Sequence, residues 1–178
     1  MKTLKQHIDE ALKIGKNLSE WSAYSCQPNT KDELKEIIRE RIKQYGNNCD
    51  LNDIDTSLIT DMSSLFLYSA FKGNISNWNT SNVRKMKWMF YKSSFNNDIS
   101  NWDVSKVEDM SEMFYWSNFN KPIGDWNVRN VKTMWGMFHE SDFDKDISKW
   151  NISEDCDTSH MLLGCPIREE FKPKFDKS

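Results

Sequence analysis

The sequence predicts an α/β repeat solenoid of about five 24-residue strand-helix turns, stacked behind a helical N-terminal cap. The first observation is an internal repeat with a fixed 24-residue period. The second is a change of apolar spacing within each repeat, and the third is an amphipathic pattern just before the first repeat. The expected divisions are a helical extension and cap over 1–46, five repeats over 47–166 and a charged tail over 167–178.

Aromatic, aliphatic and methionine residues recur in columns with this period. The tryptophan column is Trp78, Trp102, Trp126 and Trp150, and phenylalanine, isoleucine and methionine columns run in step with it. Residues 47–70 are a degenerate copy and residues 143–166 a decaying copy. Stacked repeats bring each column together, so we expect ladders of like side chains in the core. The paired methionines fit this core better than a Cu(I) site, because they keep step with phenylalanine and valine.

The apolar spacing predicts the local structure of one repeat. Trp102 and Val104 alternate with polar residues, which is typical of a short half-buried strand. Apolar side chains then recur at every third or fourth position over 107–114, which predicts a short helix. Ser105 and Glu108 have the spacing of a capping box at the start of that helix. The unit therefore reads as a strand followed by a helix.

A longer helix is predicted before the repeats. Thr30 and Glu33 form a capping box, and Gly46 is expected to end the helix. Its apolar face is Leu34, Ile37, Ile38 and Ile42, which should cover the first repeat. Residues 1–28, with a first helix suggested by Leu4, Ile8 and Leu12, remain open between further cap and partner contact. The tail is expected to fray after Phe171.

Composition narrows the function classes. The chain has 178 residues, 29% charged residues and a net charge of −3, and no apolar run long enough for a membrane span. It shows no secretory signal, so we expect a cytoplasmic protein. No basic stripe for nucleic acid, catalytic motif, metal-ligand cluster or cofactor motif is recognisable, so no enzyme activity is expected. The four cysteines form no C-x-x-C pair and are expected to be free thiols.

Three stretches resemble a known family. "CDLNDIDTSLITDMSSLF", "ISNWNTSNVRKMKWMF" and "FNNDISNWDVSKVEDMSEMF" are similar to BspA-like bacterial surface protein repeats, also described as mycoplasma-type lipoprotein repeats, which are relatives of leucine-rich repeats. The resemblance covers about residues 30–165. It implies a leucine-rich-repeat-like solenoid without enzymatic activity and with roles in adhesion or protein binding. This chain shows neither a signal peptide nor a lipobox cysteine, as in short versions that look like phage or mobile-element genes.

Aromatic residues outside the core columns are the candidate binding residues. They are Tyr68, Trp88, Tyr91, Tyr115, Trp116 and Trp135. Tryptophan and tyrosine at partly exposed positions are the composition of a protein-binding hot spot. Tiling of these rings against one another between neighbouring turns is an equally open interpretation.

A second candidate surface is the polar face of the predicted strands. It presents Asp53, Asp55, Asn77, Asn79, Asn101, Asp103, Asp125, Asn127 and Asn151. These side chains either hydrogen-bond between turns or form a polar recognition surface, and a weak Ca²⁺ site among them stays open.

Three functions remain in view. The first is a non-catalytic scaffold that binds a protein inside the cell, in its sharpest version a phage or mobile-element protein acting on a bacterial host protein, in the host-cell cytoplasm. The second is an adhesin-like module for carbohydrate or a host surface. The third is a structural subunit that associates with itself through the aromatic residues.

Overall fold

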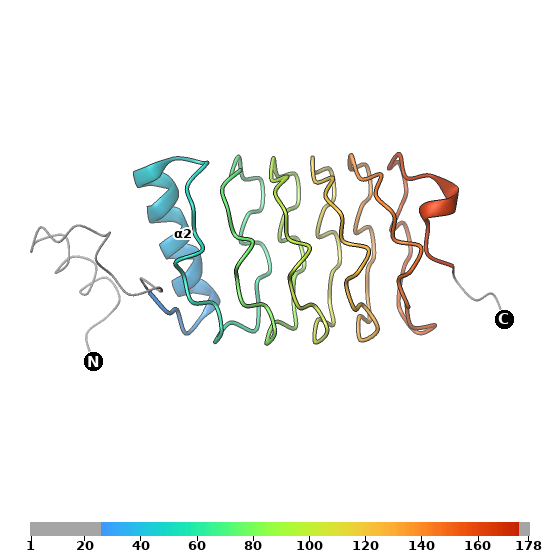
Figure 1. The fold of residues 1–178 in the computed structure, drawn as a ribbon, viewed down its shortest axis with the longest axis horizontal. Helices are drawn as coiled ribbons and strands as arrows, with labels where there is room; N and C mark the ends of the chain where they lie inside the picture. Colours follow the sequence, from blue (N-terminus) through green and yellow to red (C-terminus); the bar gives the residue numbers. More distant parts are fainter. Residues whose placement is uncertain (1–25, 175–178) are drawn as a thin grey trace, which may run out of the picture.

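The computed structural model describes residues 26–174, which form a column of stacked 24-residue turns (Figure 1). Helix α2 (Lys31–Tyr45) lies at one end and the 3-10 helix η2 (Glu169–Phe171) at the other. We call the segments 47–70, 71–94, 95–118, 119–142 and 143–166 rungs 1 to 5. Neighbouring rungs run parallel, and isolated bridges such as Lys85 to Asp109 connect them.

The predicted strand-helix turn is wrong. Within residues 26–174, α2 is the only α-helix and no strand extends beyond an isolated bridge. Two positions in every rung have a positive φ, and a left-handed residue cannot continue a right-handed helix. One column is Ser64, Trp88, Glu112, Gly136 and His160, and the other is Tyr68, Lys92, Trp116, Glu140 and Gly164. The chain is therefore not an α/β solenoid of the leucine-rich-repeat type.

Consecutive four-residue turns take the place of the expected helix. In rung 3 the N–H of Met113 donates to the carbonyl of Met110 at 3.2 Å, and the N–H of Tyr115 donates to Glu112 at 3.3 Å. Met113 ends the first turn and Phe114 is the third residue of the second, and both side chains return to the interior. Apolar spacing of three to four residues thus arises without a helix.

The intervening N–H groups bond to the next rung. The N–H groups of Met110, Glu112, Phe114 and Trp116 donate to carbonyls of Thr133, Trp135, Met137 and His139 at 2.8 to 3.0 Å. The same pattern repeats at the other junctions between rungs. The polar backbone of each turn is satisfied partly within the rung and partly along the column, as a buried backbone requires.

The predicted capping box at Ser105 and Glu108 is also wrong. The N–H of Ser105 donates to Oδ1 of Asp103 at 3.0 Å, which is a side-chain turn and not a helix cap. Glu108 instead pairs with Arg84 of the preceding rung, at 2.9 Å, and with Lys132 of the following rung. This carboxylate therefore connects three rungs.

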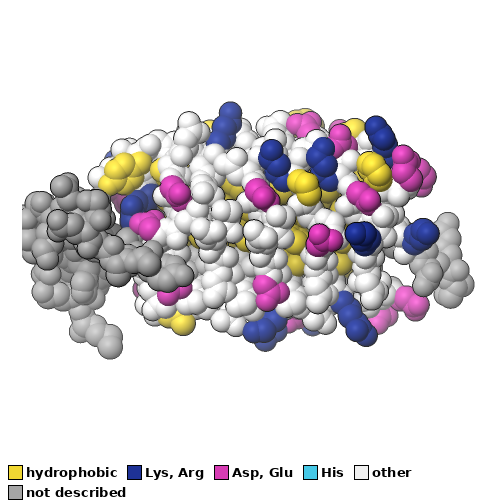
Figure 2. All heavy atoms as spheres, viewed as in Figure 1, with side chains coloured by type: hydrophobic (Ala, Val, Ile, Leu, Met, Phe, Trp, Pro, Cys, Tyr) yellow, Lys and Arg dark blue, Asp and Glu magenta, His cyan; other side chains and the backbone are white. Residues whose placement is uncertain are grey.

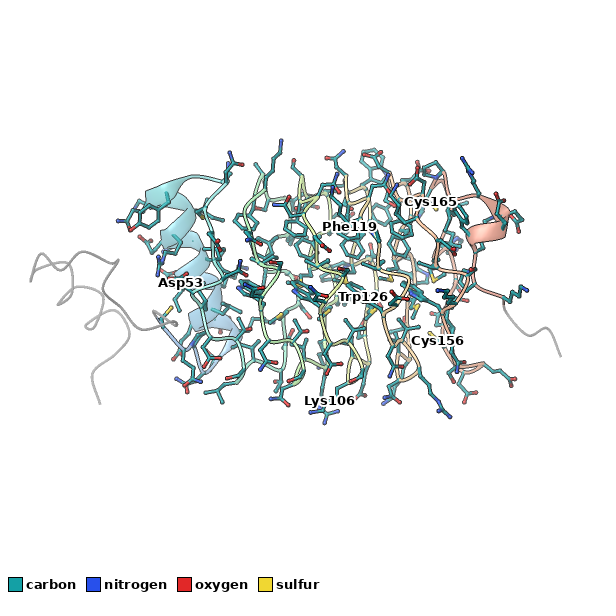
Figure 3. The ribbon with its side chains drawn as sticks, viewed as in Figure 1. Asp53, Lys106, Phe119, Trp126, Cys156 and Cys165 are labelled. Atoms are coloured by element: carbon teal, nitrogen blue, oxygen red, sulfur yellow. The ribbon has the colours of Figure 1, made fainter. Side chains whose placement is uncertain are left out.

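The core is made of the predicted ladders. Phe119 and Trp126 lie inside the column while Lys106 points away from it (Figure 3), and the two aromatic side chains are 0% and 4% exposed. The rings of Phe90 and Phe114 stack with centroids 5.5 Å apart. Stacked aromatic pairs of this kind add to the stabilisation from burial. The expectation that tryptophan and methionine columns form the core is confirmed.

Helix α2 forms the predicted cap. Oγ1 of Thr30 accepts from the N–H of Glu33 at 3.2 Å, and the Glu33 carboxylate accepts from the N–H of Asn29 at 2.7 Å. Gly46, with φ of 82°, ends the helix. The buried face of α2 consists of Leu34, Ile37 and Ile38. The suggested helix around Leu4, Ile8 and Leu12 lies outside the described residues.

The C-terminal end begins a further partial turn. Ile167, 7% exposed, follows Phe143 by one period. The carbonyl of Phe171 accepts from the N–H of Ile147 at 3.0 Å. Residues up to Phe171 therefore cover part of rung 5, while residues 175–178 of the expected fraying tail lie outside the described range. The boundaries proposed for the three divisions remain predictions.

Candidate binding site

The six predicted aromatic residues lie along one side of the column and are called the aromatic strip: Tyr68, Trp88, Tyr91, Tyr115, Trp116 and Trp135. Trp135 is connected to the others through His160 and His139. Tyr68 is 65% exposed and Trp116 is 57% exposed. Trp88 and Trp135 are each 38% exposed. Among the described residues, most other large apolar side chains are buried, so the strip is the main aromatic surface of the column.

Local backbone geometry produces this exposure. Each rung has two left-handed positions. Trp88 occupies the first in rung 2 and Trp116 the second in rung 3, with φ of 58° and 51°. Their neighbours Met89 and Ser117 are buried. The positive φ at each tryptophan turns its side chain to the surface and the following side chain to the core. The exposure of Tyr68, Trp88 and Trp116 is therefore a consequence of the turns that replace the helix.

The tyrosines form the inner part of the strip. Tyr91 and Tyr115 stack with ring centroids 4.8 Å apart, and Tyr68 contacts Tyr91 edge-on at 5.5 Å. Tyr91 and Tyr115 are half-buried. Their rings therefore pack against each other between neighbouring rungs, which is one of the two interpretations left open by the sequence. Tyr68 and Trp116 remain mostly exposed above them. Tiling between rungs therefore accounts for Tyr91 and Tyr115, while protein binding by the exposed rings stays a prediction.

Two histidines continue the strip toward rung 5. His139 contacts Tyr115 at 4.8 Å, and the rings of His139 and His160 lie 6.2 Å apart. His160 also meets the ring of Trp135 edge-on at 6.2 Å. These two histidines were not connected with the aromatic residues in the sequence analysis. The signal was present, since His139 stands in the column of Tyr91 and Tyr115.

Two lysines lie over the rings. Nζ of Lys92 is 4.9 Å from the centroid of Trp116 and 5.6 Å from that of Tyr91. Nζ of Lys87 is 4.3 Å from the centroid of Trp88. These are cation–π distances, which place positive charge on the exposed aromatic surface. The strip is therefore amphipathic and not simply apolar.

One carboxylate belongs to the same surface. Oε1 of Glu112 accepts from the indole N–H of Trp88 at 2.8 Å. Partial burial raises the pKa of Tyr91, and the nearby hydroxyls of Tyr68 and Tyr115 and the Glu112 carboxylate add to the increase. Glu112 also lines a groove of about 220 Å³ with Leu67, Tyr68, Trp88 and Tyr91. A single side chain of a partner fits a groove of this size.

The polar face mainly maintains the fold. Asp55, Asn79, Asp103 and Asn127 each accept, through Oδ1, the N–H two residues further on, at 2.9 to 3.4 Å. These bonds lie within a rung, whereas one of the two interpretations left open by the sequence was bonding between rungs. Bonds between rungs come from other side chains, such as Asn82 to the carbonyl of Ser57 at 2.9 Å.

The described part of the chain shows no metal centre, and one of its faces shows no basic surface for nucleic acid. On the face in Figure 2, basic and acidic side chains are interspersed along the column, without a large area of one sign. Residues 26–174 contain no group of three His, Cys, Asp or Glu side chains placed to hold a metal ion. Cys49, Cys156 and Cys165 are thiols, as predicted. None of the helices described is long and apolar enough to cross a membrane.

The fold and the strip together define a repeat column with an amphipathic aromatic surface along one side. The family model described as "Mycoplasma protein of unknown function, DUF285" matches residues 33–118 and 115–171, and the chain belongs to this family. The predicted mycoplasma-type repeat family is thereby confirmed at this level. Comparisons with curated proteins and with solved structures gave no match.

Proposed function

We propose that this chain is a non-catalytic repeat scaffold whose aromatic strip binds a protein. The observation that carries the proposal is the exposure of Tyr68 and Trp116, at 65% and 57%, in a stack of rungs whose phenylalanine and tryptophan ladders are buried. Exposed tryptophan and tyrosine with adjacent basic side chains are the residues that dominate protein-binding energies. The strip is held in place by the ladder of bonds between rungs and is therefore preorganised.

The dimensions of the strip favour a macromolecular partner. The groove beside Trp88 and Tyr91 has a volume of about 220 Å³, which is below the usual size of a small-molecule pocket. The exposed rings extend from rung 1 to rung 4, so a ligand must reach along several rungs to contact all of them. A protein surface does this, whereas a small metabolite contacts one or two rings.

The finer relationship and the setting are part of the same proposal. We propose that the repeat is related to those of BspA-like surface proteins, because the stretches around Trp78 and Trp102 carry the family pattern. We further propose that the protein acts in the cytoplasm, on a bacterial host protein if a phage or mobile element encodes it.

The proposal is tested by capture followed by titration. Bacterial lysate is passed over the wild-type chain, over Tyr68→Ala/Trp116→Ala, and over Leu58→Ala as a matched control. Leu58 is 48% exposed but lies outside the strip. A protein retained by the wild type is then purified and titrated by calorimetry. We expect the double variant to bind at least about tenfold more weakly and the control to bind unchanged.

Equal retention by all three chains would reject the strip as the binding surface. A glycan array with the same variants tests the adhesin-like alternative. Strip-dependent glycan binding without any retained protein would replace the protein partner by carbohydrate.

A further inference from the structure

The outer left-handed column has a symmetric order of side chains. One residue stands in each rung, in the order Tyr68, Lys92, Trp116, Glu140 and Gly164. All five have similar positive φ values, between 50° and 76°, so the backbone presents them from equivalent positions. Trp116 is at the centre, with opposite charges one rung away on either side. Two rungs away stand Tyr68, which has the most exposed ring of the strip, and Gly164, which has no side chain.

We propose that a second copy of this chain docks antiparallel on the aromatic strip, with the twofold axis passing at Trp116. The proposal rests on the proposed function, a protein-binding strip, and names the partner. In a twofold interface each contact occurs twice, because residue i meets j and residue j meets i. An axis perpendicular to the column keeps each column facing its own copy while reversing the order of the rungs.

Charge complementarity follows from this arrangement. Lys92 faces Glu140 of the partner subunit, and Glu140 faces Lys92 of the partner subunit. Within residues 26–174, neither Lys92 nor Glu140 makes an ion pair. Both side chains are exposed. Each is thus available for a partner of opposite charge, and such pairing fixes register and orientation.

Size complementarity follows as well. Tyr68 faces Gly164 of the partner subunit, so the most exposed ring of the strip meets an exposed glycine with the Glu140 carboxylate of that subunit beside it. In the other left-handed column, Trp88 faces Gly136 of the partner subunit. Gly136 is buried beneath side chains of its own chain, so Trp88 meets Glu112 and His139 of the partner subunit around this glycine. The glycine pairing therefore supports the docking at rungs 1 and 5 only.

The column between these two adds apolar contacts. Tyr115 meets its own copy, Tyr91 faces His139 of the partner subunit, and Leu67 faces Leu163 of the partner subunit. Leu163 is 51% exposed in the single chain, which this pairing would reduce. Glu112 is the exception, because it meets Glu112 of the partner subunit and like charges oppose association. Removal of this charge should strengthen the dimer.

The central experiment is sedimentation equilibrium of the full chain at increasing concentration. The variants are Lys92→Glu, Glu140→Lys and the double exchange Lys92→Glu/Glu140→Lys. Each single change places like charges together, and we expect the dimer dissociation constant to rise at least about tenfold. The double exchange restores opposite charges across the axis and should return the constant to near the wild-type value. Lys72→Glu and Glu154→Lys, exposed positions outside the strip, are the matched controls.

Two further readouts define the geometry and the opposing charge. In a mixture of two differently tagged chains, Lys92→Cys and Glu140→Cys, oxidation should join residue 92 to residue 140 and form few bonds between equal positions. Glu112→Gln should lower the dissociation constant. Circular dichroism confirms that each exposed substitution leaves the fold intact.

A wild-type chain that stays monomeric to about 100 µM, a typical range for weak association, would overturn the dimer. Failure of the double exchange to restore association would overturn it equally. Either result leaves the proposed function standing if the capture experiment finds a strip-dependent protein other than this chain. A dimer that is indifferent to Tyr68→Ala/Trp116→Ala, together with no strip-dependent capture, would reject both.

Discussion

The indole N–H of Trp102 donates to the main-chain carbonyl of Ile75 at 3.1 Å, although the two residues are 27 positions apart in the chain. The same bond joins each tryptophan of the column to the rung before it, at 2.9 to 3.2 Å. The column therefore provides both burial and a buried hydrogen bond between rungs. Phenylalanine supplies only burial, which explains the use of tryptophan at this position.

This bond can be separated from the burial of the ring. Trp102→Phe keeps an aromatic ring but removes one of the two donors to the carbonyl of Ile75, which keeps the N–H of Trp78 at 3.2 Å, and should cost about 0.5–1.5 kcal/mol. Trp102→Ala also creates a cavity and should cost about 3–5 kcal/mol. Urea denaturation measures both. Trp116→Ala, at an exposed position, should change stability by less than about 0.5 kcal/mol, and equal losses would refute the division between core and strip.

The left-handed positions give opposite expectations for two substitutions. Ser64 has a φ of 62°, and Ser64→Gly should raise the free energy of unfolding of the protein by up to about 1 kcal/mol. Gly136, with φ of 60°, should be destabilised by about 1 kcal/mol when replaced by alanine. A Cβ there meets nothing closer than Cγ of Glu112 at 3.4 Å, so backbone strain is the main cost. Thermal melts of both variants would refute this if the signs agreed.

The aspartate turns predict a loss of stability in acid. The side-chain and backbone hydrogen bonds from Ser105 lower the pKa of Asp103, and those from Ser100 lower the pKa of Asp98. A carboxyl with a folded pKa below the unfolded value of about 3.9 stabilises the fold fully above that value. The contribution disappears as the pH falls through the lower, folded pKa.

Replacement by asparagine isolates this contribution. Asp103→Asn retains an acceptor for the N–H of Ser105, as Asn79 and Asn127 do at equivalent positions. The variant should show a flatter dependence of melting temperature on pH below about 4 than the wild type. An unchanged slope would mean that Asp103 does not contribute.

The thiol of Cys156 should react slowly in the folded protein. Burial raises its pKa to about 11, and the neighbouring Asp157 carboxylate adds to the increase. At pH 8 only about a thousandth of this thiol is then thiolate, which is the reactive form. Alkylation by iodoacetamide followed by peptide mass spectrometry should show much faster labelling of Cys156 in urea. Equal rates in both conditions would contradict the burial.

Column membership could be predicted from the sequence, but turn geometry could not. Trp102, Met110 and Phe114 repeat with a fixed period, and identical spacing places identical residues at equivalent depths. Their spacing of three to four residues fits a helix and a chain of four-residue turns equally well. What distinguishes the two is the sign of φ at Glu112 and Trp116, and neither residue type favours the left-handed region.

The candidate strip was partly predictable for the same reason. Trp88, Trp116 and Trp135 depart from the core columns, which predicted partial exposure correctly. The contact of Lys92 with the rings of Tyr91 and Trp116 depends on the backbone direction at residue 92, which no sequence pattern indicates. The pairing of His139 with His160 likewise requires knowledge of how adjacent rungs align.

The equivalent bonds between rungs allow the number of rungs to change by gain or loss of whole repeats. Since the N–H groups of rung 3 donate to rung 4 as those of rung 2 donate to rung 3, an in-frame duplication or loss of one repeat leaves every surviving junction chemically equivalent. Such a change would nevertheless move the midpoint of the strip away from Trp116. A change in the number of repeats would therefore alter which chains can dimerise, without any substitution in the binding surface.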